Sequence, residues 1–170
     1  MTLLPMCGRA RMLGNDVSTD AIISSRRKKD TIDPQILRAY LFEDLDAALA
    51  PSLVAGDILV AGSNFGCGSA MEVAVTVVLA AGIRAVVARS FSRTYLRNAM
   101  NNGLLPVIAE TGSVQEGDTL SLHMDGQGTL LLAVADCTPI VCDPIAPFML
   151  DMLALGGLVP YLRRHGGFAA

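Results

Sequence analysis

The stretch that most constrains the fold is a glycine-rich turn, Gly62-Ser63-Asn64-Phe65-Gly66-Cys67-Gly68-Ser69-Ala70-Met71-Glu72, set between two apolar runs. The run before it, 58–61, predicts a buried strand, and the run after it, 73–81, is long enough for a helix that stops at Gly82. Ser69 and Glu72 have the spacing of a capping box, which predicts that Ser69 opens this helix. A strand, a glycine turn and a helix N-terminus in this order direct free N–H groups toward one point, which suits an anion.

The same turn can also be interpreted without a ligand. Glycine turns between strands and helices are common, and Ser69 can serve as a helix cap alone. The turn contains neither the Gly-Lys-Ser/Thr of the phosphate loop nor the dinucleotide fingerprint. From this turn alone, an anion site and a purely structural bend both stay open.

The surrounding segments predict an α/β fold. A strand at 83–88, a helix at 92–102 and a strand at 104–108 continue the pattern as a parallel βαβ unit. Such a unit places the glycine turn at the C-terminal end of a strand, where open parallel sheets bind ligands. We expect further elements at 6–13 (strand), from Asp33-Pro34 (helix), at 119–124 and 127–135 (a hairpin around Asp125-Gly126), and at 144–155 and 158–164 (helices). The predicted fold is a mostly parallel sheet with flanking helices plus an appended β-hairpin layer.

Composition narrows the class of protein. At 170 residues the chain is expected to form a single domain, 1–170, and although 52% of it is apolar, no uncharged stretch reaches membrane-spanning length. We expect neither a secretory leader nor membrane insertion. The net charge of −3 and the lack of Trp disfavour nucleic-acid binding. The four cysteines are scattered without a Cys-x-x-Cys pair, so we expect a cytoplasmic protein with reduced thiols and no metal site on this chain.

The most polar segment contains four consecutive cations, Arg26, Arg27, Lys28 and Lys29. A run of this kind usually forms a solvated loop. It can also form a mobile loop that closes over an anionic ligand, in which arginines make bidentate contacts and lysines act as point charges. A contact to RNA is a third possibility, which an acidic chain supports only weakly.

Three segments together resemble a known family: 15–23 (Asn-Asp-Val-Ser-Thr-Asp-Ala-Ile-Ile), the turn 62–72, and the segment from Ser90-Phe91 to Leu105-Pro106. Their order and spacing resemble the small subunit of 3-isopropylmalate dehydratase, which is the swivelling domain of the aconitase superfamily. The resemblance covers nearly the whole chain, and Asn-Phe-Gly-Cys-Gly-Ser is a specific motif in this context. It implies a swivelling β/β/α domain.

The resemblance implies that the chain is half of an enzyme. In the family, a separate large subunit holds a [4Fe–4S] cluster on three cysteines, the active site lies between the subunits, and a hydroxy acid is dehydrated and rehydrated. The serine matched by Ser69 is the base that takes the carbon-bound proton. Neighbouring backbone N–H groups, here those of Gly68, Ala70 and Met71, hold a substrate carboxylate. A serine can act in this way only if oriented N–H groups and cations stabilise its alkoxide.

The chain departs from the family pattern at several positions. After the cysteine the family has Gly-Ser-Ser-Arg-Glu-His, whereas this chain has Gly68-Ser69-Ala70-Met71-Glu72-Val73, so a serine and an arginine that touch substrate are missing. The family's Asp-Thr-Asp is Ser18-Thr19-Asp20 here, and Asp20 remains a candidate for substrate binding. The loop that sorts substrates is apolar in the isopropylmalate type, but 26–29 is basic here.

Two hypotheses follow from these departures. In the first, Arg26, Arg27, Lys28 and Lys29 replace the lost arginine, and the enzyme acts on a hydroxy di- or tricarboxylic acid with a more polar arm. In the second, the chain is a non-catalytic anion-binding or interaction module that keeps the swivel fold. We expect the first, with Ser69 as the base, because Ser69 and the glycines of the turn are retained.

Overall fold

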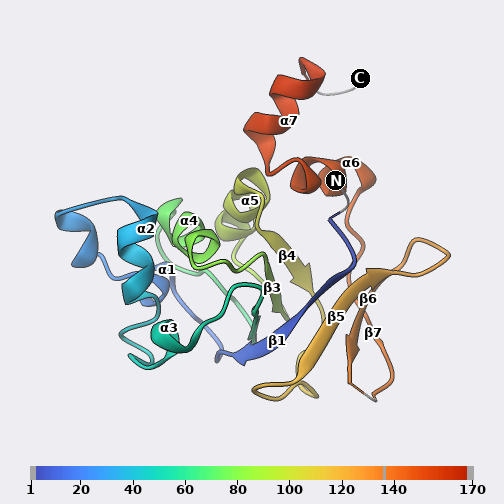
Figure 1. Cartoon of the computed structure of the whole chain (residues 1–170), viewed down its shortest axis with the longest axis horizontal. Helices are drawn as coiled ribbons and strands as arrows, with labels where there is room; N and C mark the ends of the chain where they lie inside the picture. Colours follow the sequence, from blue (N-terminus) through green and yellow to red (C-terminus); the bar gives the residue numbers. More distant parts are fainter. Residues whose placement is uncertain (1–2, 136, 168–170) are drawn as a thin grey trace.

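The computed structural model describes residues 3–135 and 137–167, which fold around one seven-stranded sheet (Figure 1). The strand order is β4-β3-β2-β1-β5-β6-β7. The strands are β1 Met6–Met12, β2 Ile58–Ala61, β3 Ala85–Ala88, β4 Leu105–Ile108, β5 Thr119–Met124, β6 Leu130–Val134 and β7 Ile140–Val141. The helices are α1 Thr19–Ile22, α2 Pro34–Leu37, α3 Leu49–Ser52, α4 Val73–Ala80, α5 Arg93–Asn102, α6 Pro147–Ala154 and α7 Leu158–His165, with 3₁₀ turns η1 Arg27–Lys29 and η2 Arg38–Tyr40. No described helix is long and apolar enough to cross a membrane.

The glycine turn belongs to a parallel βαβ unit, as predicted. β2 pairs with β3, β3 with β4, and β1 with β2, all in parallel. Every residue of β2 and β3 is buried, which is typical of parallel strands covered on both faces. All four strands therefore end at the same edge of the sheet, and the turn follows β2 at that edge.

The other half of the sheet is antiparallel. The upstream part of β1 pairs with β5, with Met6 opposite Leu122, while its downstream part pairs with β2, with Ala10 opposite Ile58. β5 and β6 form the predicted hairpin, and β7 adds a short strand that the sequence did not predict. Three of the six pairings are parallel and three antiparallel. The described sheet is therefore mixed, and only its β1–β4 half is parallel.

Two apolar clusters lie on opposite faces of β2 and β3. Leu59 and Val86 face the cluster that α1, α2, α4 and α5 cover. Their neighbours Ile58 and Val87 face the cluster that the hairpin and α6 complete. Successive side chains of a strand point to opposite faces, so each strand serves both clusters. The hairpin thus covers one face of the parallel half, in agreement with the predicted hairpin layer. It is also continuous with the sheet, because β5 pairs with β1.

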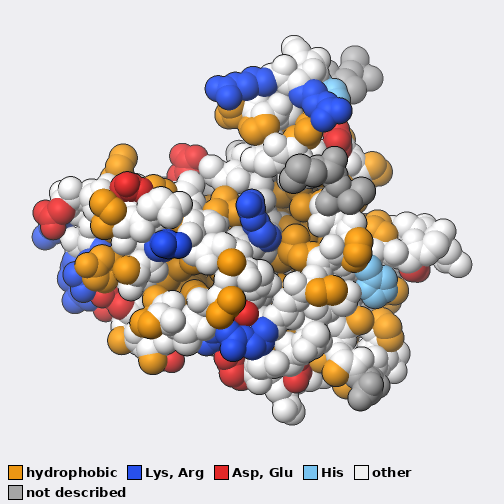
Figure 2. Space-filling model, in the orientation of Figure 1, with side chains coloured by type: hydrophobic (Ala, Val, Ile, Leu, Met, Phe, Trp, Pro, Cys, Tyr) orange, Lys and Arg blue, Asp and Glu red, His pale blue; other side chains and the backbone are white. Residues whose placement is uncertain are grey.

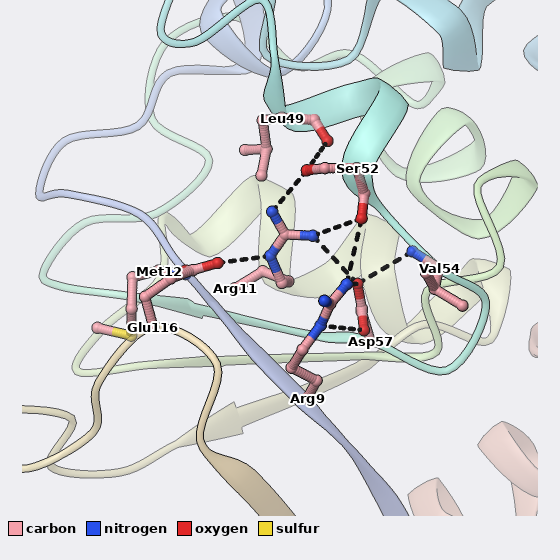
Figure 3. A network of polar contacts seen from close by, with 8 residues as sticks. All are labelled: Arg9, Arg11, Met12, Leu49, Ser52, Val54, Asp57 and Glu116. Carbon is pink, nitrogen blue, oxygen red and sulfur yellow. Dashed lines mark hydrogen bonds and ion pairs between the residues drawn. The ribbon is translucent and has the colours of Figure 1, made fainter.

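A polar network ties β1 to the segments around it (Figure 3). Asp57, just before β2, accepts hydrogen bonds from Arg9 at 2.9 Å and from Arg11 at 3.3 Å. Arg11 is only 6% exposed and also donates to Glu116 at 2.7 Å. Burial alone raises the pKa of Asp57, but hydrogen bonds from Arg9, the Val54 N–H and Arg11 outweigh it and hold that pKa below its ordinary value of 3.8.

Candidate functional site

The glycine turn is braced from two sides. On one side, the Gly66 N–H donates to the Val17 carbonyl at 2.7 Å, and the Thr19 N–H donates to the Cys67 carbonyl at 2.8 Å. On the other side, the Ser92 hydroxyl donates to the Gly66 carbonyl at 2.6 Å. The segment after β1 and the segment after β3 therefore fix the turn between them, at the edge of the sheet where the parallel strands end.

Two glycines of the turn have left-handed backbone conformations, with φ of +76° at Gly66 and +90° at Gly68. A Cβ at Gly66 would lie 2.2 Å from Cγ of the buried Tyr95, so packing requires glycine there. A Cβ at Gly68 would meet nothing closer than Thr19 Oγ1 at 3.7 Å, so only its φ favours glycine. At Gly66 the turn therefore packs closely against the chain itself, while the space beside Gly68 is open.

Ser69 lies at the exposed end of the turn and does not open a helix. α4 begins at Val73 with Glu72 as its N-cap and no side-chain capping bond, so the predicted capping box is wrong. The reason is that Thr19 Oγ1 donates to the Ser69 carbonyl at 2.9 Å and holds it outside the helix. Within the described chain, the Ser69 hydroxyl and the backbone N–H groups of residues 68–71 make no hydrogen bond.

Two of the four cations pair with carboxylates outside the turn. Arg27 makes a two-point contact with Glu43, at 2.9 Å and 2.7 Å, and Arg26 pairs with Asp44 at 2.6 Å. The hydrogen bonds from Arg27 hold the pKa of Glu43 below its ordinary value of 4.5. The acidic residues Glu43 and Asp44 therefore pair with the basic segment, and this pairing engages Arg26 and Arg27, which we expected to contact the substrate.

Lys28 reaches the turn. Its ammonium group donates to the thioether sulfur of Met71, and both side chains are half-buried. Lys29 is exposed and makes no ion pair with any described residue. The Asp20 carboxylate accepts the Ser25 N–H at 2.8 Å, and this hydrogen bond is the main cause of the lowered pKa of Asp20. Asp20 thus holds the start of the basic segment.

The structure therefore gathers Gly68, Ser69, Ala70 and Met71 with Lys28 on one open surface. Sequence reasoning missed Thr19 as a brace of Ser69, although Thr19 lies in one of the segments that carried the resemblance. It also missed Glu43 as the partner of Arg27. The opposite charges of the runs 26–29 and 43–46 were the signal that could have revealed this pairing.

A separate hollow lies away from these residues. It is a groove of about 610 Å³ between α5, α6 and α7, the helix that projects from the body in Figure 1. Basic side chains lie over α7 in Figure 2, and the last turn of this helix carries Arg163 and Arg164. The groove contains none of the predicted site residues; its lining is Arg97, Met100, Asn101, Phe148, Met149, Met152, Leu158 and Tyr161. Across the described ranges, no three His, Cys, Asp or Glu side chains are grouped to hold a metal ion.

The parallel unit, its glycine turn and the covering hairpin define an aconitase-type domain. A family model of the aconitase C-terminal domain matches residues 42–112. The chain is 42% identical over 160 residues to the 3-isopropylmalate dehydratase small subunit of Syntrophus aciditrophicus, covering 92% of this chain and 95% of that protein. It is 40% identical over 158 residues to the methanogen homoaconitase small subunit of Methanocaldococcus jannaschii, covering 93% and 91%.

A solved structure agrees with these relatives. The crystal structure of 3-isopropylmalate dehydratase (leuD) from Methanocaldococcus jannaschii superposes with a TM-score of 0.87 at 37% identity, covering 96% of each chain. The chain belongs to the family of 3-isopropylmalate dehydratase small subunits, within the aconitase superfamily, and is accordingly a hydro-lyase subunit. The resemblance predicted from the motifs is confirmed.

Proposed function

We propose that this chain supplies one wall of an active site that a separate large subunit completes, and that the enzyme dehydrates and rehydrates a hydroxy di- or tricarboxylic acid. The observation that carries the proposal is the contact between Lys28 and Met71, which joins the basic segment to the glycine turn. An ammonium group, the Ser69 hydroxyl and the N–H groups of residues 68–71 then face one open surface.

Each group has a distinct role in this proposal. Ser69 is the base that removes the carbon-bound proton, and its alkoxide needs the nearby positive charge and N–H dipoles to form at neutral pH. The N–H groups of Gly68, Ala70 and Met71 bind a substrate carboxylate, as consecutive unpaired amides bind anions elsewhere. Asp20 fixes the start of the segment that carries Lys28.

We assign the [4Fe–4S] cluster to the large subunit. In the described chain Cys7 and Cys137 are exposed, Cys142 is buried and Cys67 lies in the glycine turn, so these thiols do not form the clustered donor set that such a cluster requires. Bound in the partner, the cluster would supply a Lewis-acidic iron for the substrate hydroxyl. We also propose that the enzyme acts in the cytoplasm, where thiols stay reduced.

Lys28 bears on the choice of substrate. Met71 cannot pair with a carboxylate, and losing an arginine–carboxylate contact costs roughly 2–3 kcal/mol. The ammonium group beside Met71 restores a positive charge at that place. An isopropyl arm packed there would desolvate this cation without compensation. We therefore expect a substrate with a carboxylate or another polar group on its variable arm.

Reconstitution tests the proposal. The chain is combined anaerobically with its large subunit, and turnover is measured on 3-isopropylmalate and on hydroxy tricarboxylic acids of different arm length. Ser69→Ala is expected to lower kcat by about 100-fold or more, because it removes the base. Unchanged turnover in this variant would remove Ser69 from its role, and a preference for 3-isopropylmalate would contradict the polar arm.

The alternative to this proposal is a non-catalytic anion-binding module, which the methionine at position 71 raised but which the dehydratase and homoaconitase relatives do not favour. This candidate predicts that carboxylates bind to the chain but that no hydroxy acid is turned over with the cluster-loaded large subunit. Calorimetric titration of the chain with citrate, run beside the reconstitution assay, separates the two functions.

A further inference from the structure

The contact between Arg27 and Glu43 differs from an ordinary surface ion pair. The guanidinium group meets both carboxylate oxygens of Glu43, at 2.9 Å and 2.7 Å, and lies over the Tyr40 ring at 3.9 Å. The Glu43 side chain is only 17% exposed and also lies 3.7 Å from Arg26, whereas Asp44, the nearer partner of Arg26 at 2.6 Å, is 44% exposed. A bidentate, stacked and partly shielded pair fixes the guanidinium plane, which an exposed single contact does not.

Glu43 itself stands on a rigid base. The preceding residue, Phe42, is fully buried and has a φ of +58°. Its N–H donates to the Ile22 carbonyl at 3.0 Å, which ties this turn to the end of α1. Core packing thus holds the backbone that carries Glu43, and Arg27 binds the carboxylate presented from it.

The position of Arg27 sets the direction of Lys28. Both residues belong to the 3₁₀ turn η1, in which successive side chains point about 120° apart. With Arg27 held against Glu43, the next side chain is directed to another side of the turn, where Lys28 meets Met71. Asp20 holds the start of the same segment through Ser25, so the segment is anchored at two points before Lys28.

We infer that Glu43 is a positioning residue, which acts through Arg27 and η1 to hold the Lys28 ammonium group over the glycine turn. The inference deepens the proposed function and rests on it where substrate binding is concerned. The placement of Lys28 by Glu43 is independent of that function and can be measured on the chain alone.

The first experiment uses the full chain with ¹³C-methyl methionine, and the Met71 signal is assigned with Met71→Leu. Lys28→Ala is expected to shift the Met71 methyl resonance, because it removes the ammonium group. Glu43→Gln is expected to reproduce most of that shift, and Glu43→Asp part of it. The double variant Arg27→Glu with Glu43→Arg, which exchanges the two charges, is expected to restore the wild-type Met71 resonance. Asp44→Asn is the matched control, since it removes an equal charge one residue away, and it is expected to leave the signal in place. An unmoved Met71 signal in Glu43→Gln overturns the inference.

The second experiment uses the reconstituted enzyme. Glu43→Gln is expected to raise KM roughly tenfold and to lower kcat as well, because the displaced ammonium group no longer binds the carboxylate or supports the Ser69 alkoxide. The double variant Glu43→Gln with Lys28→Ala is expected to be no worse than Lys28→Ala alone, because both changes act through one ammonium group. Additive effects overturn the path through Lys28. A shifted Met71 signal with unchanged KM keeps the positioning role and refutes instead the use of Lys28 in substrate binding.

Discussion

Gly66 illustrates how a single residue without a side chain shapes the site. Its backbone carbonyl and N–H are both hydrogen-bonded to neighbouring segments, and the ring of Tyr95 occupies the space where a Cβ would lie. Gly68, two residues on, has the same sign of φ but open space beside it. The two glycines are therefore constrained by different physics, which the sequence pattern does not distinguish.

Alanine at each position separates these constraints. Gly66→Ala is expected to lower the free energy of unfolding by about 3 kcal/mol or more, because the new methyl group clashes with Tyr95 and the φ is unfavourable. Gly68→Ala is expected to cost about 1 kcal/mol, from the φ alone. Urea unfolding measures both values. Equal losses would mean that Tyr95 moves aside at no cost.

The two lysines provide a matched test of the open surface. Lys28→Ala is expected to raise KM for a carboxylate-armed substrate about tenfold, as the loss of one charge-assisted contact does. Lys29→Ala removes the same charge from the next residue, which is exposed and unpaired within the described chain, and is expected to change KM less than about twofold. Steady-state kinetics of the reconstituted enzyme measure both KM values. Equal increases in KM for the two variants would mean that any nearby positive charge has this effect and that Lys28 makes no specific contact with the substrate.

At the level of single residues, sequence reasoning located the turn and Ser69 but could not separate the four cations. Their chemical types gave no sign that Arg26 and Arg27 pair with Asp44 and Glu43, because that choice depends on the rotation of η1 and on a turn 16 or more residues away.

Among the elements, α4 and α5 each come after a serine, but only the serine before α5 caps its helix. Ser92, where the sequence predicted a helix to begin, caps α5, and its hydroxyl accepts the Tyr95 N–H at 3.3 Å. Ser69 was expected to cap α4, but Thr19 holds its carbonyl elsewhere. A capping pattern shows only that a local sequence is able to cap a helix. At Ser69, the tertiary hydrogen bond from Thr19 prevents it. β7 was missed because two residues carry no periodicity.

Removing the Ser92 hydroxyl should affect two elements together. Ser92→Ala loses both the cap of α5 and the bond to the Gly66 carbonyl, so we expect a cost of about 1–2 kcal/mol and faster amide exchange in the turn 65–68. Asp33→Ala is the control, because Asp33 caps α2 through the Gln35 N–H at 2.9 Å without touching the turn. Hydrogen exchange followed by mass spectrometry compares them, and similar exchange in the turn of both variants would contradict the bracing role of Ser92.

For the whole molecule, the sequence supported the parallel half better than the antiparallel half. Buried runs at β2 and β3 and the glycine turn between them follow local rules that a short window contains. The pairing of β1 with β5 links residues more than 100 positions apart, and the network of Arg9, Arg11, Asp57 and Glu116 spans the same distance. No local pattern encodes such partners.

This network predicts how stability depends on pH. The pKa of Asp57 lies below its ordinary value of 3.8 in the folded chain, so its contribution is complete above about pH 4 and is lost as the pH falls through the lowered pKa. We expect the free energy of unfolding to fall over that acidic range, and Asp57→Asn to be less stable at pH 7 but to show a shallower fall. Urea unfolding from pH 6 to pH 3 measures this, with Glu110→Gln as an exposed control. An unchanged slope in Asp57→Asn would assign acid sensitivity to other carboxylates.

The position of β1 between the two halves has a consequence for synthesis. β1 leaves the ribosome before both of its partners, which include Ile58 on one side and Leu122 on the other. Closing such long loops is slow, and the later one cannot close until residue 122 has emerged. The nascent chain must therefore leave one edge of β1 unpaired until residue 122 has emerged, and that open edge is a site for aggregation during synthesis.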